Sequence, residues 1–234
     1  TRWLEKNGGT RFFAWIHYDD PHLPYDPPSP EKEASAGRPY DGEIAYMDRY
    51  VGAVLEALED RGLRDKTLIV IAGDHGEGLG DKVETGHGIF LYEETLRVPL
   101  IVQDAAAFPK PRVVAGPVRL VDVAPTILET LGLAGEAAAM EGRSLVPWIK
   151  DPDRPGPACL VETFYPRENF GWSELVGLVD GSWKLIQAPR PELYDLAADP
   201  GETANLAASS PAKADEMRQA LERELVGLSA KSGP

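Results

Sequence analysis

A short apolar run that ends abruptly in a glycine-rich polar loop constrains this chain most. Residues 68–72 read Leu-Ile-Val-Ile-Ala, and residues 73–78 read Gly-Asp-His-Gly-Glu-Gly. A brief β-branched run of this kind is typical of a buried strand in an α/β sheet, and such sheets place their sites at the carboxyl ends of their strands. Asp74 and His75 would offer a carboxylate oxygen and an imidazole nitrogen at such a position, which favours a divalent metal site. A helix cap or a closed turn is the alternative use of the same two residues.

Two further histidines lie in loops of the same kind. His87 follows on the same loop, within Thr-Gly-His-Gly at residues 85–88. His22 lies in the proline-rich segment 21–28, where helix is forbidden and an extended loop is forced. The apolar run before it, residues 11–17, predicts a buried strand, so His22 also follows a strand end. An exposed loop histidine without a function is the alternative for His22.

The periodicity of the rest of the chain predicts an α/β domain followed by an antiparallel tail. Residues 1–150 are expected to form a mostly parallel sheet flanked by helices, and residues 151–234 a small α+β subdomain with a terminal helix. The segment 151–157 is rich in Pro, Asp and Arg and suggests the linker between them. The expected elements are helices at 44–61 and from Asp122, strands at 67–72, 98–102, 118–120, 160–164, 173–179 and 182–186, a hairpin turn at Asp180-Gly181, and a last helix with the apolar stripe Met217, Leu221, Leu225 and Leu228. Asp122 is expected to be structural, as the N-cap of its helix and not as a metal ligand.

Charge and cysteine content exclude some classes of function. Lys and Arg number 24 against 38 Asp and Glu, a formal net charge of −14. This charge argues against non-specific binding to nucleic acid and against adhesion to an anionic membrane. No apolar run has the length of a membrane span. The only cysteine, Cys159, cannot form an internal disulfide, so the compartment stays unknown, and its strand-like surroundings predict an ordinary buried thiol.

Several motifs together resemble one family. Residues 73–77 (Gly-Asp-His-Gly-Glu), 86–88 (Gly-His-Gly) and 91–101 (Leu-Tyr-Glu-Glu-Thr-Leu-Arg-Val-Pro-Leu-Ile) are similar to the sulfatase family of the alkaline phosphatase superfamily, and residues 192–206 resemble the tail of that family. The resemblance implies an alkaline-phosphatase-like fold and a sulfuric ester hydrolase, which cleaves a sulfate ester with the help of a metal ion. It implies Asp74 and His75 as metal ligands, and His22 and His87 as catalytic residues that bind the anion or protonate the leaving oxygen.

The resemblance also suggests the cofactor and the substrate class. Calcium is the usual metal of the family and is the first expectation here. Mostly oxygen ligands favour calcium, magnesium or manganese, whereas one imidazole favours manganese or zinc. The substrate is expected to be a sulfate ester of a small molecule or a glycan. Its identity is not readable, because the loops that select it vary freely within such folds.

The sequence departs from the family pattern in two ways. The motif Cys-x-Pro-x-Arg, which carries the nucleophile in sulfatases, does not occur, so we expect a front half with the nucleophile and the first metal-binding carboxylates to be missing and the chain alone to be catalytically incomplete. Such a fragment would expose sheet edge and apolar surface and would tend to associate with itself. Many sulfatases also carry a lysine about where His87 stands, and Lys82 comes too early to replace it.

Two other functions stay open at this point. A loop like residues 73–88 also occurs in the phosphoethanolamine transferases, so a transferase or phosphodiesterase of the same superfamily is the first alternative. A non-catalytic domain that keeps the fold and binds a partner is the second. The presence of Asp74, His75, His22 and His87 argues against the second alternative.

Overall fold

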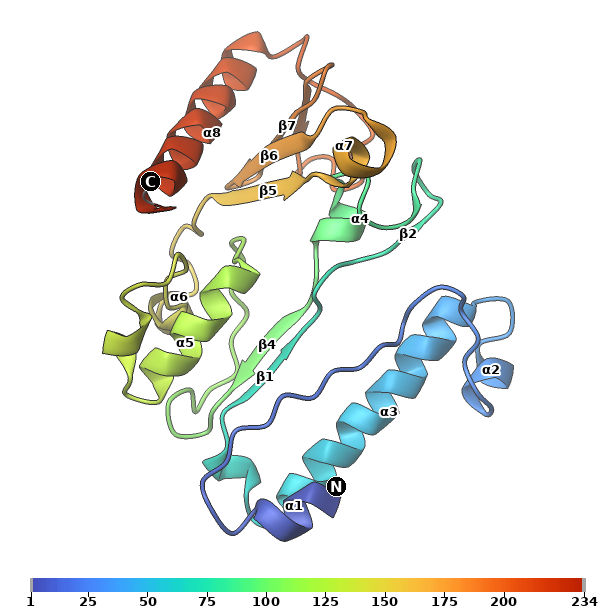
Figure 1. Ribbon diagram of the computed structural model, residues 1–234, viewed down its shortest axis with the longest axis vertical. Coiled ribbons are helices and arrows are strands. Elements are labelled where there is room, and N and C mark those ends of the chain that lie inside the picture. Colours follow the sequence, from blue (N-terminus) through green and yellow to red (C-terminus); the bar gives the residue numbers. More distant parts are fainter. Residues whose placement is uncertain (1, 233–234) are drawn as a thin grey trace. The chain divides into compact units, whose positions relative to one another are not determined.

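The computed structural model of the chain describes residues 2–232, and these divide into two compact units (Figure 1). The first unit holds residues up to Ile69 together with Asp104–Ala106. The second holds Val70–Gln103 and the chain from Ala107 onward. Within residues 2–232 no helix is both long and apolar enough to cross a membrane.

The first unit is built on one long helix. α3 runs from Pro39 to Glu59, with proline at the first helical position, where its missing N–H is no loss. The expected helix is confirmed, with an earlier start. Its buried face packs against α1, and Gly62, at a φ of +60°, follows its end. The unit also contains α1 (Arg2–Asn7), α2 (Glu31–Ala34) and the 3₁₀ helix η1 (Arg64–Lys66), and its core consists of Leu4, Ala57 and Leu58 with Phe12, Leu63 and Ile69 around them.

The strand expected at residues 11–17 is wrong. The segment is irregular, and the side chains of Phe13 and Trp15 are 73% and 82% exposed. A strand is stable only where its backbone N–H and C=O groups bond to a neighbouring strand. Among the described residues of the first unit, no strand pairs with this segment, so its apolar composition is not sufficient to form one.

The predicted strand before the Gly-Asp-His-Gly loop is confirmed. β1 (Ile69–Ala72) lies beside β4 (Leu100–Gln103), which confirms the two expected apolar strands, although each begins two residues later than expected. The loop between them is itself folded. It contains the antiparallel pair β2 (Gly78–Leu79) and β3 (Thr85–Gly86), and then the short helix α4 (Glu93–Leu96).

A helical layer follows β4, and it corrects two expectations. Residues 118–120 form no strand, because the chain turns into the 3₁₀ helix η2 (Leu120–Asp122) ahead of α5 (Val123–Thr130). Asp122 stands at the N-cap of α5 but makes no side-chain cap bond. Its fully buried carboxylate instead accepts hydrogen bonds from the Arg119 guanidinium, at 2.7 and 2.9 Å, and from the Arg143 N–H, at 2.8 Å. Asp122 is structural, as expected, but it acts as a buried acceptor that joins the start of α5 to the segment around Arg143. The 3₁₀ helix η3 (Ala134–Ala137) and α6 (Val146–Lys150) complete the layer.

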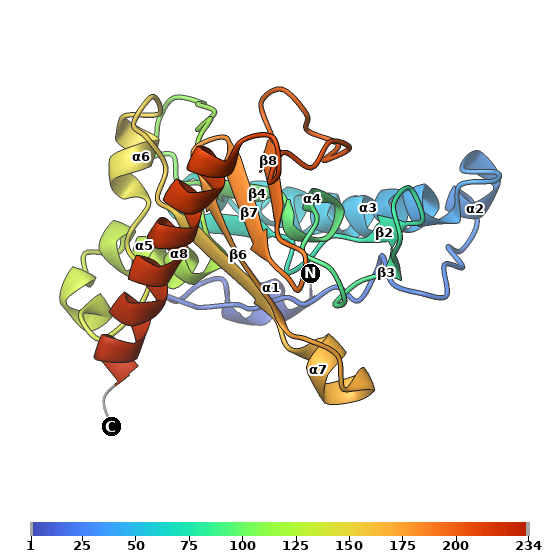
Figure 2. The same cartoon turned by 90° about the horizontal axis from the view of Figure 1, so that it is seen from above.

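The tail of the chain forms the expected antiparallel sheet and terminal helix. Four strands follow the order β5-β6-β7-β8, with every neighbouring pair antiparallel (Figure 2). Asp180 pairs with Trp183 across the predicted hairpin turn. α8 packs on this sheet, and its Met217 and Leu221 are buried while Leu225 is 37% exposed, so the stripe is buried over part of its length. The elements of the tail are β5 Cys159–Thr163, α7 Tyr165–Phe170, β6 Leu175–Asp180, β7 Trp183–Gln187, β8 Glu192–Asp195 and α8 Pro211–Ser232. The expected domain boundary between residues 150 and 151 stays a prediction.

Candidate active site

The turn after β1 is fixed by the backbone on both sides of Asp74 and His75. The N–H of Gly73 donates to the carbonyl of Pro99 at 3.1 Å, and the N–H of Gly76 donates to the carbonyl of Thr95 at 2.8 Å. A Cβ at position 76 would lie 2.2 Å from the carbonyl oxygen of Glu94, so only glycine allows this approach. The side chains of Asp74 and His75 project from this tight turn and are 79% and 39% exposed.

Hydrogen bonds set the orientation of the two predicted metal ligands. Nδ1 of His75 lies 2.9 Å from the carbonyl oxygen of Gly76, which assigns its proton to Nδ1 and leaves Nε2 as the basic nitrogen. Nε2 lies 3.9 Å from Oδ2 of Asp74, whose Oδ1 accepts the backbone N–H of His75 at 3.0 Å. One imidazole nitrogen and one carboxylate oxygen therefore face the same small space.

His87 joins this pair. Its ring stacks on the ring of His75 with centroids 3.8 Å apart and an interplanar angle of 29°. Its Nδ1 lies 3.1 Å from Oε1 of Glu77, a side chain that is only 4% exposed. The structure thus brings Asp74, His75 and His87 together and adds Glu77 to them.

The segment that carries His87 is tied down by another buried carboxylate. Glu84 is 3% exposed and accepts the N–H of Ile89 at 2.8 Å and the N–H of Phe90 at 3.0 Å. Gly88 has a φ of +102°, which favours glycine, and its carbonyl accepts a hydrogen bond from Oγ1 of Thr163 at 2.5 Å. Glu77 and Glu84 were not predicted as site residues. The sequence feature that could have indicated them is a carboxylate within a glycine-rich loop, because backbone N–H groups and a histidine are the donors that such a loop offers.

His22 lies in the first unit, on a loop held by Glu43. The two carboxylate oxygens of this buried residue of α3 accept the N–H of His22 at 3.1 Å and the N–H of Asp26 at 2.7 Å. The His22 imidazole is exposed, and its Nδ1 lies 2.8 Å from the carbonyl oxygen of Leu23. Glu43 was not predicted as a residue that supports the site. The place of His22 beside the other three residues stays a prediction.

Lys82 is engaged elsewhere in the second unit. Its Nζ donates to the backbone carbonyl of Glu202 at 2.8 Å and lies 4.0 Å from the centroid of the Tyr92 ring. The Glu202 carboxylate in turn pairs with the fully buried Lys184, at 2.7 Å, which also pairs with Glu93 at 3.1 Å. These contacts join the β2–β3 turn to β7 and to the segment after β8. They agree with the expectation that Lys82 does not take the anion-binding position.

The side chains present fit only part of a metal site. Asp74 and His75 supply two donors, and residues 2–232 contain no group of three His, Cys, Asp or Glu side chains that could hold an ion. A carboxylate with an imidazole suits a divalent cation, but at least one more ligand is needed. Cys159 is no candidate, because burial raises the pKa of its thiol to about 12. The prediction of an ordinary buried thiol is confirmed.

Comparison with known proteins identifies the family. The family model described as sulfatase matches residues 1–133, and the model described as the C-terminal part of N-sulphoglucosamine sulphohydrolase matches residues 86–231. The first match alone covers more than half of the chain. The chain therefore belongs to the sulfatase family of the alkaline phosphatase superfamily.

Individual relatives agree with this assignment. The choline-sulfatase of Rhizobium meliloti is 33% identical over 187 residues, covering 76% of this chain and 34% of that protein. A protein solved in complex with its substrate D-glucosamine-2-N,6-O-disulfate is 30% identical, with a TM-score of 0.70 over 80% of this chain and 40% of its own. The phosphonate monoester hydrolase of Agrobacterium radiobacter is 28% identical, with a TM-score of 0.65 over 83% and 41%. The chain thus spans between a third and about two fifths of the length of these relatives. The structural matches confirm the expected α/β, alkaline-phosphatase-like fold class.

Proposed function

We propose that the protein is a sulfuric ester hydrolase, which transfers the sulfuryl group of an ester to water and releases an alcohol and inorganic sulfate. The observation that carries this proposal is the cluster of Asp74, His75 and His87 in the loop after β1. The Glu77 carboxylate contacts Nδ1 of His87 and so orients its ring. The cluster lies in a chain of the sulfatase family, and a choline-sulfatase is among its relatives.

His87 is the residue that we assign to the leaving group or to the sulfate oxygens. Glu77 keeps a proton on Nδ1, so Nε2 is the nitrogen that would meet the substrate. Donation to the leaving oxygen requires the imidazolium form of His87, in which Nε2 also carries a proton; Nε2 gives up this proton while Nδ1 keeps its own. Such general acid catalysis contributes roughly 10²- to 10⁴-fold. The stacking contact with His75 limits rotation of the ring and so keeps Nε2 aimed in one direction. His22 is proposed as a second contact for the anion, on the family resemblance alone.

Asp74 and His75 would hold a divalent ion, with calcium first and manganese, magnesium or zinc as alternatives. When bound, such an ion neutralises charge on the non-bridging oxygens of the ester. The exposed Asp74 oxygen and the Nε2 of His75 supply two of its ligands. The family resemblance implies that two further carboxylates and the nucleophile complete the shell of ligands, and the Cys-x-Pro-x-Arg motif that carries the nucleophile in sulfatases does not occur among residues 1–234.

The proposal is tested by turnover of 4-nitrophenyl sulfate. The protein is expressed from its complete natural reading frame, with calcium added, and compared with His87→Ala and His17→Ala. His17 is an exposed histidine to which no role in the reaction is assigned, and it serves as the control. We expect His87→Ala to lower kcat by at least about 100-fold and His17→Ala to change it little. A kcat that is the same in His87→Ala as in the wild type would overturn the assignment.

A phosphonate monoester is the second candidate substrate. The match to a phosphonate monoester hydrolase favours it, and so does the chemistry, because a sulfate monoester and a phosphonate monoester each carry one negative charge. The ratio of kcat/KM for 4-nitrophenyl sulfate to that for 4-nitrophenyl phenylphosphonate discriminates the two. A ratio above one supports the sulfatase, and a ratio below one supports the phosphonate hydrolase. A protein that binds both esters and turns over neither would be a binding domain.

A further inference from the structure

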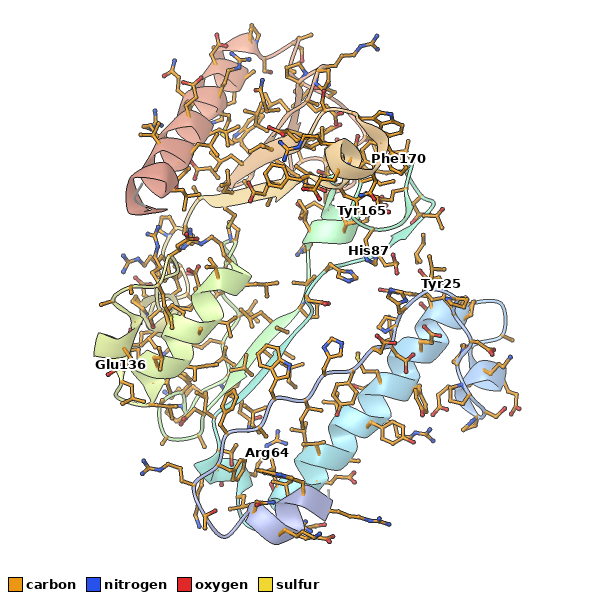
Figure 3. All side chains as sticks on the ribbon, in the orientation of Figure 1. Tyr25, Arg64, His87, Glu136, Tyr165 and Phe170 are labelled. Atoms are coloured by element: carbon orange, nitrogen blue, oxygen red, sulfur yellow. The ribbon has the colours of Figure 1, made fainter. Side chains whose placement is uncertain are left out.

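The short helix α4 holds both segments that form the candidate site. The N–H of Gly76, in the turn of the candidate metal ligands, donates to the carbonyl of Thr95 at 2.8 Å. The Glu94 carbonyl lies against the same turn, where a Cβ at position 76 would be 2.2 Å from it. The Thr95 hydroxyl bonds to the carbonyl of Phe90 at 3.3 Å, and Figure 3 shows the labelled His87 side chain beside this helix. A displacement of α4 would therefore loosen the site from two sides.

The side chain of Glu94 places an acid group in unfavourable surroundings under this helix. Its Oε1 is buried and has no hydrogen-bond partner within residues 2–232. Burial raises the pKa of this carboxyl, and the Lys82 ammonium opposes that effect. Three carboxylates raise the pKa further, those of Glu84, Asp81 and Glu202. Both burial and like charges disfavour the ionised form, so the fold favours the neutral carboxyl.

The two lysines that face this group have other partners. Nζ of Lys82 donates to the backbone carbonyl of Glu202 at 2.8 Å. The fully buried Lys184 pairs with the Glu202 carboxylate at 2.7 Å and with Glu93 at 3.1 Å. Within the part of the chain that the structure describes, neither ammonium forms an ion pair with Glu94. The ionised form of Glu94 would therefore face several carboxylates without a directly bonded cation.

A pocket beside α4 gives protons access to this group. It has a volume of about 520 Å³, and its walls come from the turn between β2 and β3, from α4, from β8 and from residues 200–203. Glu94 is one of the residues that line it, together with Asp81 and Lys82. A pocket of this size admits water, and water exchanges protons with a carboxyl group that it reaches. The protonation of Glu94 can therefore follow the pH of the medium.

We propose that Glu94 is a proton-sensitive switch for the candidate site: its neutral form keeps α4 seated on the turn of Asp74 and His75, and its charged form loosens that contact. The inference rests on the proposed function, because it concerns the regulation of the same site. A carboxylate that ionises away from water and among like charges is destabilised, and movement of α4 toward water relieves this strain.

The raised pKa of Glu94 sets the direction of the pH effect. The contribution of the carboxyl to the seated form of α4 is fully present below the ordinary pKa of a glutamate. It is lost as the pH rises through the raised pKa of the folded protein. The turn after β1 is therefore held most firmly in acid and less firmly at neutral pH.

The test measures hydrogen exchange of the Gly76 amide by NMR, from about pH 5 to about pH 8, in the calcium-loaded protein from the complete natural reading frame. The protection factor divides out the intrinsic effect of pH on exchange and reports opening of the bond from Gly76 to Thr95. We expect it to fall by roughly threefold or more over this range. Glu94→Gln keeps the shape of the side chain without its charge and should hold the high protection throughout.

Two further variants check that the effect comes from the charge of Glu94. Glu129→Gln makes the same change at an exposed glutamate of α5 and should behave as the wild type. Asp81→Asn removes one of the repelling carboxylates and should move the midpoint of the Gly76 transition to lower pH. Titration of the histidines is common to all of these proteins, so a difference between them reports Glu94.

Two other amides show whether the event is local. Gly76 should exchange faster than the buried Leu221 of α8, because loosening of α4 requires less free energy than unfolding of the whole unit. The N–H of Leu133 bonds to the carbonyl of Leu128 at 2.7 Å, just after the end of α5. Its protection should be equal in the wild type and in Glu94→Gln, since α4 takes no part in its opening.

Three results would overturn the inference. The first is a Gly76 protection factor that does not change with pH in the wild type. The second is the same pH dependence in Glu94→Gln as in the wild type. The third is an equal free energy of opening for Gly76 and Leu221, which would assign the effect to global unfolding.

Turnover of 4-nitrophenyl sulfate measures the consequence for the site. The ratio of kcat/KM in Glu94→Gln to that in the wild type should be near one in acid and should rise with pH. A ratio that is independent of pH would contradict regulation of the site by Glu94. Failure of the proposed function has a different signature, because the exchange behaviour of Gly76 would then persist while no sulfate ester is turned over.

Discussion

Oε1 of Glu77 lies 3.1 Å from Nδ1 of His87, and that imidazole stacks on His75 with ring centroids 3.8 Å apart. One buried carboxylate therefore sets the tautomer and direction of one histidine, whose ring rests on the other. The relationship makes Glu77 a positioning residue for His87 in the proposed mechanism. It also explains why both histidines can be partly exposed and still hold one orientation.

The first prediction concerns this positioning role. Glu77→Ala should lower kcat for sulfate ester hydrolysis by about 10- to 100-fold, because partners of this kind have effects of that size. KM should change little, since the anion would still meet the other groups of the site. Glu77→Gln keeps an acceptor oxygen near Nδ1 and should recover part of kcat. Equal kcat in Glu77→Ala and the wild type would show that the contact has no role in the reaction.

The second prediction concerns the tie under the His87 segment. Glu84→Gln replaces one of two acceptor oxygens with an NH₂ group, which faces a backbone N–H that then has no acceptor. We expect a loss of about 1–3 kcal/mol in the free energy of unfolding, measured by urea denaturation. The exposed Glu141→Gln is the matched control and should stay within about 0.5 kcal/mol of the wild type. An unchanged midpoint for Glu84→Gln would contradict the assigned hydrogen bonds.

The third prediction uses two adjacent glutamates of α4 with opposite surroundings. Burial raises the pKa of Glu94, whose Oε1 is buried without a hydrogen-bond partner, while Glu93 pairs with Lys184. A raised carboxyl pKa favours the protonated form in the fold. The contribution of Glu94 to stability is therefore fully present below the ordinary pKa of a glutamate. This contribution is lost as the pH rises through the raised pKa that Glu94 has in the folded protein. At pH 7, Glu94→Gln should stabilise the protein and Glu93→Gln should destabilise it.

Thermal unfolding at several pH values checks this pair. The advantage of Glu94→Gln over the wild type should disappear below about pH 4, where the glutamate is protonated in both states. An advantage that stays constant from acid to neutral pH would contradict the role of charge. A stabilising Glu93→Gln would contradict the ion pair with Lys184.

The fourth prediction concerns the buried pair between Lys184 and Glu202. Both side chains are almost fully buried, and their charged atoms are 2.7 Å apart. Among the residues that the structure describes, Glu202→Gln leaves Glu93 as the charged partner of the Lys184 ammonium. Removing one member of a buried pair costs about 3–5 kcal/mol, and the remaining Glu93 contact should hold the loss near the lower value. Lys213→Gln, at a surface pair, should lose less than about 1 kcal/mol in the same denaturation experiment.

Local sequence signals predicted the parts of the fold that depend on local chemistry. The abrupt end of the apolar run at Gly73 located β1 and the two candidate metal ligands, and Asp180-Gly181 located a hairpin turn. The predicted strand at residues 11–17 failed because a strand depends on a neighbour, which composition does not reveal. Asp122 was correctly expected to be structural, but its long-range partner Arg143 lies beyond the reach of any local pattern.

In the candidate site, too, local sequence predicted some residues and missed those that depend on their partners in the fold. Asp74, His75 and His87 share one loop, and their grouping followed from that loop and from the family resemblance. The supporting carboxylates were missed because their partners are backbone N–H groups and an imidazole, which leave no spacing pattern in the sequence.

The measurement that tests the central claim most directly is the release of sulfate from 4-nitrophenyl sulfate as a function of added calcium. It compares the wild-type protein from the complete natural reading frame with Asp74→Asn, which removes a charged oxygen ligand and keeps the shape of the side chain. We predict that calcium restores turnover in the metal-depleted wild type and that Asp74→Asn requires far more calcium or stays inactive. Identical calcium curves for the two proteins would contradict a metal-dependent ester hydrolase site at the end of β1.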